Sequence, residues 1–482
     1  MRWFKEITGI LNNEPETWLA YLHGQQLHNR PMLTREKPRY RGFFLQVAKF
    51  GALLLRDLRL KQPLELKHRA KFLVFAGTAN QMGSLDKTVS SLEYRGEELI
   101  SICDPQLLTG RDRVKDHIPY QLSITDVVRS VILFTYRGYG LYRMLKKKHP
   151  VSVKWHFATF CRVYIYLAYF YRVLSQVKPE FVITANDHNA PNRCMLAVAH
   201  LQGIKTVYLQ HASVSPIFPA LRLNYAFLDG QSALDIYREC ERNQPSTARN
   251  VPIPQVILSG QKKYLKRSNG PNKKVVGVAL NALDNAEAGI ELINALVENG
   301  QAVCLRWHPG QARRDIGQYR GAFANSERVE LSDPREEFVS NFMEKIGWLI
   351  AGNSSIHLEA ALAGVMPIYY ELEPADQPDY YGYVKHGLAA PASSVGEVLK
   401  LIENARDNHG SSAEAVRYYS STYLTEWESR EGELVAECLR RLSVGGALPV
   451  EVSEFYYTSE PVESLRQGQI LKGISPDCSL AP

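Results

Sequence analysis

The segment GWLIAGNSSIHLEAALAGVMPIYYEL, from Gly347 to Leu372, decides the fold class. GWLIAG is an apolar run of strand length, and Asn-Ser-Ser then leads into IHLEAALA, whose apolar residues recur at helical spacing. Gly364 ends that helix, and VMPIYYEL is a second run with β-prone residues. Two strands joined by a single helix run parallel, because the crossover returns the chain to the same edge. The segment therefore predicts a Rossmann-like α/β lobe.

The same alternation extends upstream from Gly347. VVGVALNA and QAVCLRW are apolar runs of strand length, and IELINALVEN between them has helical periodicity before Gly300 stops it. A further helix is predicted over 334–345. Four strands separated by three helices predict a parallel half-sheet within residues 275–410.

The N-terminal half repeats this plan, with strands that end in polar residues. KFLVFAG reads as a buried strand, PEFVITAND ends at Asn186 and Asp187, KTVYLQHAS ends at Gln210 and His211, and NYAFLDG follows. The carboxyl ends of parallel strands lie at one edge of a sheet, where ligands bind in α/β proteins. The chain is therefore predicted to be an α/β protein with two lobes.

A chain of 482 residues is too long for one compact core. Residues 243–274 are rich in proline, asparagine, serine and basic residues, which is typical of a linker. The predicted division is a basic helical N-terminal extension at 1–70, an N-terminal lobe at 71–242, the linker, a C-terminal lobe at 275–410, helices at 411–444 and a tail at 445–482.

The composition favours a cytoplasmic protein. Seven cysteines without C-x-x-C spacing fit neither a zinc site nor a disulfide framework. The start of the sequence lacks the apolar core of a signal peptide, and the most apolar run, Val163 to Tyr171, is about half as long as a bilayer span requires. We expect the chain neither to be secreted nor to span a membrane.

Basic charge is concentrated near the N-terminus. The net charge is +7, and residues 30–72 hold twelve Lys or Arg against three acids. Tyr40 to Lys61 reads as an amphipathic helix that lies on an anionic membrane surface, or as a helix that packs on the domain with a solvated basic side. Thr135 to Pro150 is a second basic and aromatic stretch. No recognition module supports a nucleic-acid partner, and none is expected.

Two strand ends of the C-terminal lobe carry candidate ligand-binding residues. His308 and Pro309 follow one strand, and Ser354 and Ser355 open the helix after another. These residues meet at one sheet edge, where a helix N-terminus with serine hydroxyls suits a phosphate and a histidine can donate to it. A turn at His308 and a plain helix cap at the serines are the alternatives.

These motifs resemble those of a known group of enzymes. HP at 308 and 309, followed by SS within GNSSIHLEAALAGVMPIYY, is similar to the paired motifs of bacterial sialyltransferases, polysialyltransferases and Kdo transferases of capsule and lipopolysaccharide assembly. Related motifs occur in CDP-glycerol and CDP-ribitol phosphotransferases. The resemblance is strongest over 275–372 and weaker over 181–230. It implies the GT-B architecture, two facing Rossmann-like lobes with parallel sheets.

The resemblance implies roles for individual residues. A cytidine nucleotide would lie in the C-terminal lobe, with its phosphate at His308, Pro309, Ser354 and Ser355, its ribose near Glu359, and Asn281 among the binding residues. Glu359 also reads as an ordinary exposed helix glutamate. Charge on the leaving nucleotide would be met by His308, the helix dipole and cations such as Arg306 or Arg313.

The N-terminal lobe would bind the acceptor and supply a general base. Asp187 is the first candidate, with an Asx turn or helix cap as the alternative. His211 is the second, although Ala212 stands where teichoic-type enzymes have glycine. The early loop GTANQMGSLD holds Asp86 as its sole acid instead of an acidic pair before glycine, which leaves the base unassigned. No D-x-D motif is present, so neither a metal nor another cofactor is expected.

The expected activity is transfer of a sialic acid-like nonulosonate or Kdo from its CMP-activated form to an oligosaccharide or lipid-linked acceptor, at the cytoplasmic side of the inner membrane. Three alternatives remain: a polyol phosphotransferase that uses CDP-glycerol or CDP-ribitol, a non-catalytic partner in capsule assembly or export, and a sugar-nucleotide epimerase.

Overall fold

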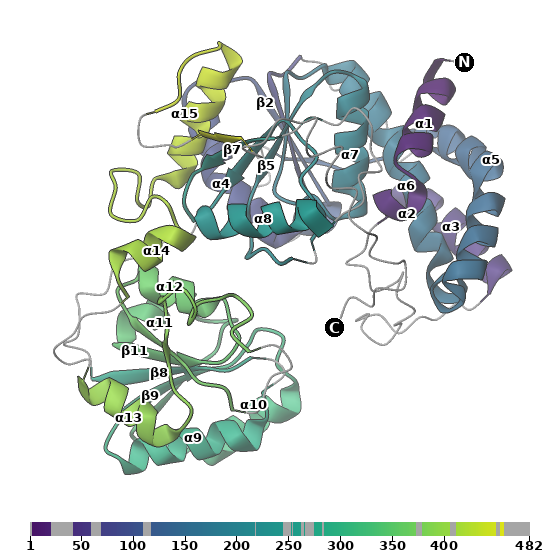
Figure 1. The fold of residues 1–482 in the computed structure, drawn as a ribbon. Helices are drawn as coiled ribbons and strands as arrows, with labels where there is room; N and C mark the ends of the chain where they lie inside the picture. The colour runs from purple at the N-terminus through teal and green to yellow at the C-terminus, as the bar shows by residue number, and fades with distance from the viewer. Residues whose placement is uncertain are drawn as a thin grey trace. The chain divides into compact units, whose positions relative to one another are not determined.

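The computed structural model describes these residues: 2–20, 42–58, 69–108, 117–216, 218–243, 252, 254–261, 265, 274–281, 284–372, 378–404, 411–449 and 454–456. The chain forms two compact units, each built on a sheet with helices (Figure 1). Unit 1 comprises Met1–Leu228, Ala233–Ser259 and Glu431–Pro482, and unit 2 comprises Asp229–Ser232 and Gly260–Arg430.

The sheet of unit 1 has the strand order β14-β7-β6-β5-β4-β1-β2-β3, and β14 is antiparallel to β7 whereas the other pairs are parallel. Its first strand, β1, lies between β2 and β4, so the direction in which strands are added reverses there. The strands are β1 (Phe72–Ala76), β2 (Leu99–Cys103), β3 (His117–Pro119), β4 (Phe181–Thr184), β5 (Lys205–Leu209), β6 (Tyr225–Leu228), β7 (Gln255–Leu258) and β14 (Glu454–Tyr456).

Helices cover both faces of this sheet. Figure 1 shows α4 and α15 on one side of the strands and α7 on the other. Leu73 and Phe75 of β1 share a core with α6 and α7, because alternate strand residues point to opposite faces. The helices are α1 (Arg2–Asn13), α2 (Glu16–Leu19), α3 (Phe43–Asp57), α4 (Ala79–Tyr94), α5 (Ile124–Lys148), α6 (Pro150–Val177), α7 (Ala190–Leu201), α8 (Gln231–Asn243) and α15 (Glu431–Ser443), with a short 3-10 turn at Pro105–Leu108.

The predicted N-terminal helical extension is integrated into unit 1. Ile7 and Leu11 of α1 and Phe50 and Leu54 of α3 are buried in the same core as α6. Figure 1 shows α1, α3 and α5 gathered around α6. Most of the basic residues counted between 30 and 72 lie outside the described residues. No helix in the described part of the chain is long and apolar enough to cross a membrane.

Unit 2 is a six-stranded parallel sheet with the order β10-β9-β8-β11-β12-β13. Its strands are β8 (Val275–Ala279), β9 (Ala302–Arg306), β10 (Val329–Ser332), β11 (Trp348–Ala351), β12 (Met366–Tyr369) and β13 (Ala390–Pro391). Its helices are α9 (Ala286–Glu298), α10 (Arg313–Ala322), α11 (Val339–Lys345), α12 (Ile356–Leu362), α13 (Val395–Asn404) and α14 (Ala413–Tyr419). One core joins the sheet to α9, α10 and α13, and a second joins it to α11 and α12. Two of the strands, β10 and β13, are not among the four predicted.

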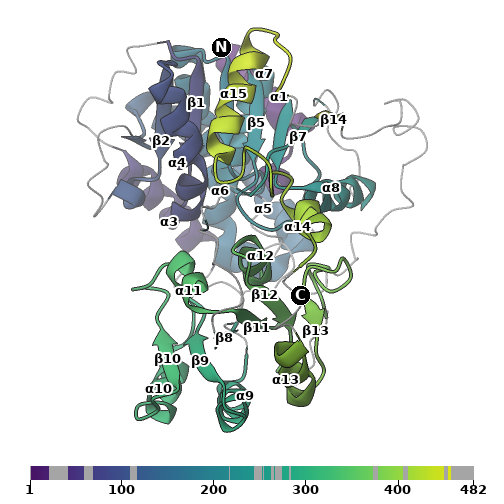
Figure 2. The same ribbon diagram turned by 90° about the vertical axis from the view of Figure 1, so that its left-hand side faces the viewer.

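The chain returns to unit 1 after completing unit 2. The predicted C-terminal helices are present as α14 and α15, but α14 belongs to unit 2 and α15 packs on α4 of unit 1 (Figure 2). A Cβ atom at Gly432 would lie 2.4 Å from Lys87 Cβ, so glycine permits this close packing. Arg95 also pairs with Glu437.

The predicted linker and tail each contribute a strand to unit 1. β7 lies within 243–274, where the apolar run QVIL follows two prolines, and β14 lies within 445–482. The change from unit 1 to unit 2 therefore falls at Ser259 and Gly260. The predicted fold class, two Rossmann-like α/β lobes with parallel sheets, is confirmed.

Candidate functional site

The candidate nucleotide site of unit 2 lies where the order of strands reverses. β8 is the first strand of this sheet, with β9 on one side and β11 on the other. Ligands of open α/β sheets bind at the carboxyl ends of the strands at such a switch point. Asn281 and Asn353 follow β8 and β11, and the side-chain amide of Asn281 donates to the carbonyl oxygen of Asn353 at 3.1 Å. The structure therefore joins Asn281 to the loop that contains the two serines.

The strand register places His308 at the same height along the sheet as Asn281 and Asn353. Val278 of β8 is paired with Leu305 of β9 and with Ile350 of β11, and three residues further on these strands lead to Asn281, His308 and Asn353. Neighbouring strands lie about 4.8 Å apart, so the backbones of His308 and Asn353 are about 10 Å apart if the strands continue straight. The motifs predicted to meet therefore lie at the same sheet edge, with Asn281 between them.

His308 begins a tight turn and is exposed. The backbone N–H of Gln311 donates to the carbonyl of His308 at 2.9 Å, and Pro309 occupies the second position of the turn, which its fixed φ favours. His308 Nδ1 accepts from the N–H of Gly310 at 3.0 Å. The neutral imidazole therefore carries its proton on Nε2. His308 can therefore form the turn through its carbonyl and Nδ1 and still donate a hydrogen bond to a ligand from Nε2.

The serine loop is held firmly, but not by a plain helix cap. Ser355 occupies the cap position of α12 without a side-chain hydrogen bond, and Ser354 Oγ accepts from the N–H of Ile356 at 3.4 Å. Asn353 fixes the loop, because its Oδ1 accepts from the N–H of Tyr380 at 2.8 Å and its Nδ2 donates to Glu371 at 3.0 Å. The Ser355 hydroxyl thus remains available to a ligand.

His357 also positions this loop, and the sequence reading missed it. Its side chain is fully buried, and Nε2 donates to the carbonyl oxygens of Ala351 and Gly352 at 3.1 and 2.9 Å. Burial lowers the pKa of His357 to about 4, so the ring is neutral at pH 7. The sequence did hold a sign of this burial, because His357 lies in the apolar helix IHLEAALA, where every residue from His357 to Leu362 is buried.

Glu359 and Arg306 lie in the interior of unit 2. Glu359 is 7% exposed, which rules out the reading as an ordinary exposed glutamate, and its charge acts on Arg306. Arg306 is 8% exposed and donates to Ser332 Oγ at 2.7 Å and to the carbonyl of Glu337 at 3.0 Å. Burial lowers the pKa of Arg306. These contacts favour a structural role for Arg306, whereas Arg313 is exposed at the start of α10.

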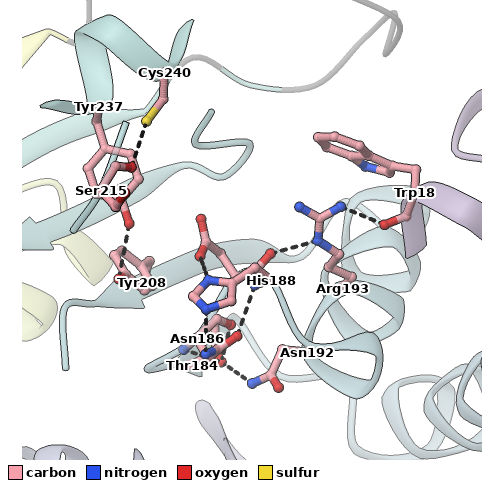
Figure 3. Close-up of polar contacts among 11 residues, drawn as sticks. Trp18, Thr184, Asn186, His188, Asn192, Arg193, Tyr208, Ser215, Tyr237 and Cys240 are labelled. Carbon is pink, nitrogen blue, oxygen red and sulfur yellow. Dashed lines mark hydrogen bonds and ion pairs between the residues drawn. The ribbon is translucent and has the colours of Figure 1, made fainter. Parts of the chain in front are cut away.

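In unit 1 the first candidate base, Asp187, is buried against a neighbouring histidine. Asp187 is 6% exposed and its Oδ1 lies 3.0 Å from His188 Nδ1. Figure 3 shows His188 among Thr184, Asn186 and Asn192, and Asn186 Oδ1 accepts from the N–H of His188 at 2.9 Å. Because the Asp187 carboxylate accepts a hydrogen bond from Nδ1–H of His188, Nε2 of that ring is an acceptor. Nε2 lies 3.4 Å from the side-chain amide nitrogen of Asn186.

The Asp187 loop is also anchored from outside. Arg193 donates to the carbonyl of Asp187 at 2.9 Å and to that of Trp18 at 2.5 Å, and its guanidinium lies 4.0 Å from the Trp18 ring centroid (Figure 3). Phe218 packs against the His188 ring. Asp187 Oδ2 has no hydrogen-bond partner among the described residues. The Asx-type hydrogen bond of this loop is made by Asn186, whose Oδ1 accepts from the N–H of His188, whereas the Asp187 carboxylate contacts the His188 ring.

His211 lies level with Asp187 on the next strand. Thr184 is paired with Tyr208, and three residues further on are Asp187 and His211. His211 is half-buried, and Gln210 shapes the turn by donating to the carbonyl of Ala212 at 3.0 Å. The two candidate bases therefore lie on adjacent strand ends of unit 1. No group of three or more His, Cys, Asp or Glu side chains able to hold a metal ion is found among the residues that the structure describes.

No family model matches the sequence, and no curated protein sequence is similar to it at a significant level. Solved structures with a similar fold include Staphylococcus aureus MnaA in a co-structure with UDP, with a TM-score of 0.49 and 13% identity over 79% of this chain and 99% of that one. CalG4, the calicheamicin glycosyltransferase, has a TM-score of 0.43 and 13% identity over 78% of this chain and 97% of its own. Neisseria meningitidis UDP-GlcNAc 2-epimerase bound to UDP-GlcNAc has a TM-score of 0.42 and 12% identity over 77% and 99%. Glycosyltransferases and epimerases both occur in this group, so the likeness does not distinguish their reactions.

Proposed function

We propose that this protein is a glycosyltransferase that moves an acidic sugar, a sialic acid-like nonulosonate or Kdo, from a CMP-activated donor to a capsule or lipopolysaccharide acceptor. The observation that carries the proposal is that Asn281, His308 and the Asn353–Ser355 loop all lie just beyond the carboxyl ends of neighbouring strands, at the switch point of unit 2. In this proposal the donor phosphate lies between the Ser355 hydroxyl and His308, with Ser354 and Pro309 shaping the two loops.

His308 would stabilise the leaving nucleotide. Its Nε2–H donates a hydrogen bond to the phosphate and offsets the negative charge that develops there. Glu359 is proposed to lie near the ribose, although its burial beside Arg306 makes packing its first role. Asp187 or His211 of unit 1 would accept the proton of the attacking hydroxyl, with His188 assisting Asp187 through their 3.0 Å contact.

The test is calorimetric titration with CMP and with CDP-glycerol, followed by assays of donor hydrolysis and transfer. We expect CMP to bind, and His308→Ala to abolish transfer while the protein stays folded. Asn341→Ala, on an exposed part of α11, is a control outside the sheet edge. If CMP neither binds nor inhibits, the CMP-sugar proposal is wrong.

The alternatives give different outcomes in the same experiment. Turnover of CDP-glycerol or CDP-ribitol without CMP-sugar transfer would identify a polyol phosphotransferase, which retains the cytidine site. Normal glycan synthesis by the His308→Ala variant would indicate a non-catalytic assembly or export partner. Conversion of a sugar nucleotide in the absence of acceptor would indicate an epimerase.

We also propose that unit 1 binds the cytoplasmic face of the inner membrane. α3 packs on the domain through Phe50 and Leu54, as the second reading of this helix predicted, but Phe44 on its outward face is 86% exposed. α3 runs antiparallel beside α5, because Phe43 lies 4.5 Å from Tyr142 and Phe50 4.9 Å from Phe134 between ring centroids.

α5 also has exposed apolar residues. Its exposed large hydrophobic residues recur at helical spacing, and they are Ile124, Val128, Val131, Ile132, Tyr136 and Tyr139. The helix ends in the exposed residues Lys146–Lys148. An apolar and aromatic face with a basic end suits the interface of an anionic bilayer, where lipid-linked acceptors would be found.

A further inference from the structure

A cavity of about 410 Å³ lies in unit 1, apart from the residues predicted to be catalytic. It opens where β1 lies between β2 and β4, which is the switch point of this sheet. Its lining comes from the carboxyl ends of β1, β2 and β3, from the start of α7, and from α3 and α6: Arg56, Asp57, Phe75, Gly77, Asp104, Pro105, Tyr120, Thr159, Arg162, Tyr166, Asn189, Ala190 and Pro191. Its volume suits one or two sugar rings.

α6 presents one row of side chains to the cavity. Thr159, Arg162 and Tyr166 are three and four residues apart, so they share one face of the helix. Arg162 is half-buried, and its guanidinium lies 5.1 Å from the Tyr166 ring centroid. It makes no ion pair or hydrogen bond with any described residue, whereas Arg56 of the same cavity is paired with Asp57 at 2.6 Å. Arg162 is therefore the cation available to a ligand.

Tyr120 adds a second unsatisfied group. The side chain is 9% exposed, and its hydroxyl has no hydrogen-bond partner among the described residues. Burial raises the pKa of Tyr120 well above its usual value, so the group stays a neutral donor. A buried hydroxyl without a partner is costly, and a ligand in the cavity would relieve that cost.

The charges of the lining define the class of ligand. Arg56 and Arg162 are balanced by Asp57 and Asp104, so the formal charge of the lining is zero. A phosphate or nucleotide with two or more negative charges would meet the two carboxylates at close range. A single carboxylate can instead pair with Arg162 in the bidentate geometry that guanidinium favours, while Asp57 and Asp104 accept hydrogen bonds from sugar hydroxyls.

We propose that this cavity binds a carboxylate-bearing sugar, with Arg162 on the carboxylate and Tyr120 donating a hydrogen bond to the same ligand. Taken with the proposed transferase function, on which this step rests, the bound group is the terminal acidic sugar of the acceptor chain. The donor and the acceptor would then both be acidic sugars, bound by different units through different chemistry.

The experiment is titration of the full chain with the α-methyl glycoside of N-acetylneuraminic acid, with methyl glucoside as the neutral comparison and inorganic phosphate as the multiply charged one. We expect only the acidic glycoside to bind. Arg162→Gln should weaken its binding by roughly 10- to 100-fold, because hydrogen bonds between charged groups are the strong ones. Tyr120→Phe should weaken it by roughly 5-fold and leave thermal stability unchanged or higher, because it removes only an unsatisfied hydroxyl.

Arg143→Gln, an exposed arginine of α5 outside the cavity, is the charge-matched control and should bind like the parent protein. Equal affinity of Arg162→Gln and the parent would overturn the proposal, as would equal binding of methyl glucoside or tighter binding of phosphate. CMP affinity, measured on the same samples, separates the two proposals. If the parent protein binds the acidic glycoside but not CMP, the transferase proposal is wrong and the cavity proposal stands. If it binds CMP but not the glycoside, the cavity proposal is wrong and the transferase proposal stands.

Discussion

Lowering the pH from 7 to 5 should destabilise unit 2 through the single buried side chain of His357. Burial lowers the pKa of this imidazole to about 4 in the folded protein, from an ordinary value of 6.5. The folded state therefore favours the neutral ring, which donates to the carbonyls of Ala351 and Gly352. As the pH falls below 6.5, His357 is protonated in the unfolded chain, whereas in the folded chain it is not protonated until about pH 4. Stability is complete above this range and is lost on acidification.

The magnitude follows from the same two values. A difference of about 2.5 pKa units corresponds to about 3 kcal/mol of free energy of unfolding, of which about 2 kcal/mol should be lost between pH 7 and pH 5. The loss should appear in unit 2. His200 of unit 1 has a pKa lowered to about 4 for the same reason, so a signal averaged over the whole chain would mix the two units.

Hydrogen–deuterium exchange at stepped urea concentrations, followed in peptides from β8 and β11, reports unit 2 by itself. The matched variant is His357→Gln, which keeps a side-chain donor of similar reach but does not titrate. Its midpoint in urea should fall less between pH 7 and pH 5 than that of the parent, by the equivalent of about 2 kcal/mol. If both proteins lose the same stability, His357 is not the group responsible and its neutral, buried state is wrong.

Three further predictions concern other parts of the molecule. Gly432→Ala places a Cβ 2.4 Å from that of Lys87 and should lower the stability of unit 1 by about 1–3 kcal/mol in urea unfolding, whereas Gly83→Ala, with open space around it, should not destabilise. Asp187→Ala should cost about 1–3 kcal/mol of unfolding free energy through loss of the contact with His188, with CMP affinity unchanged in calorimetry; a change in CMP affinity alone would contradict the structural role. Replacing Lys146–Lys148 by glutamine should weaken binding to phosphatidylglycerol vesicles by roughly 100-fold in flotation assays, at about 1 kcal/mol per lysine, and a loss that is equal on neutral vesicles would contradict an electrostatic contact.

The central strands of both units were predictable because their signals are local. β8, β9 and β11 are apolar runs bounded by glycine or polar residues, and their parallel order follows from the helices between them. The placement of His308 and of Ser354 and Ser355 at one sheet edge was predicted from the same pattern. The edge strands were not predictable in this way. β10 reads VELS and β14 is paired with a strand almost two hundred residues away, so each depends on contacts that no short window contains.

The burial and the contacts of the candidate residues were harder to predict from the sequence than their positions in the fold. Asp187 and Glu359 were correctly placed on a strand end and a helix, but a sequence pattern does not show that both are buried or that His188 and Arg306 are their neighbours. The cavity around Arg162 was hidden for the same reason, because α6 reads as a largely apolar helix and the other lining residues come from five distant segments.

The return of α15 to unit 1 has a consequence for synthesis. α4 ends at Tyr94, but the helix that covers it begins at Glu431, after the whole of unit 2. At about 5–20 residues per second, the ribosome needs on the order of tens of seconds to make the intervening chain. During that interval the face of α4 that packs on α15 has no native cover, and by its end unit 2 has all of its strands. Unit 1 is therefore completed only after unit 2 has been made, and chaperones would meet unit 1 before α15 packs on α4.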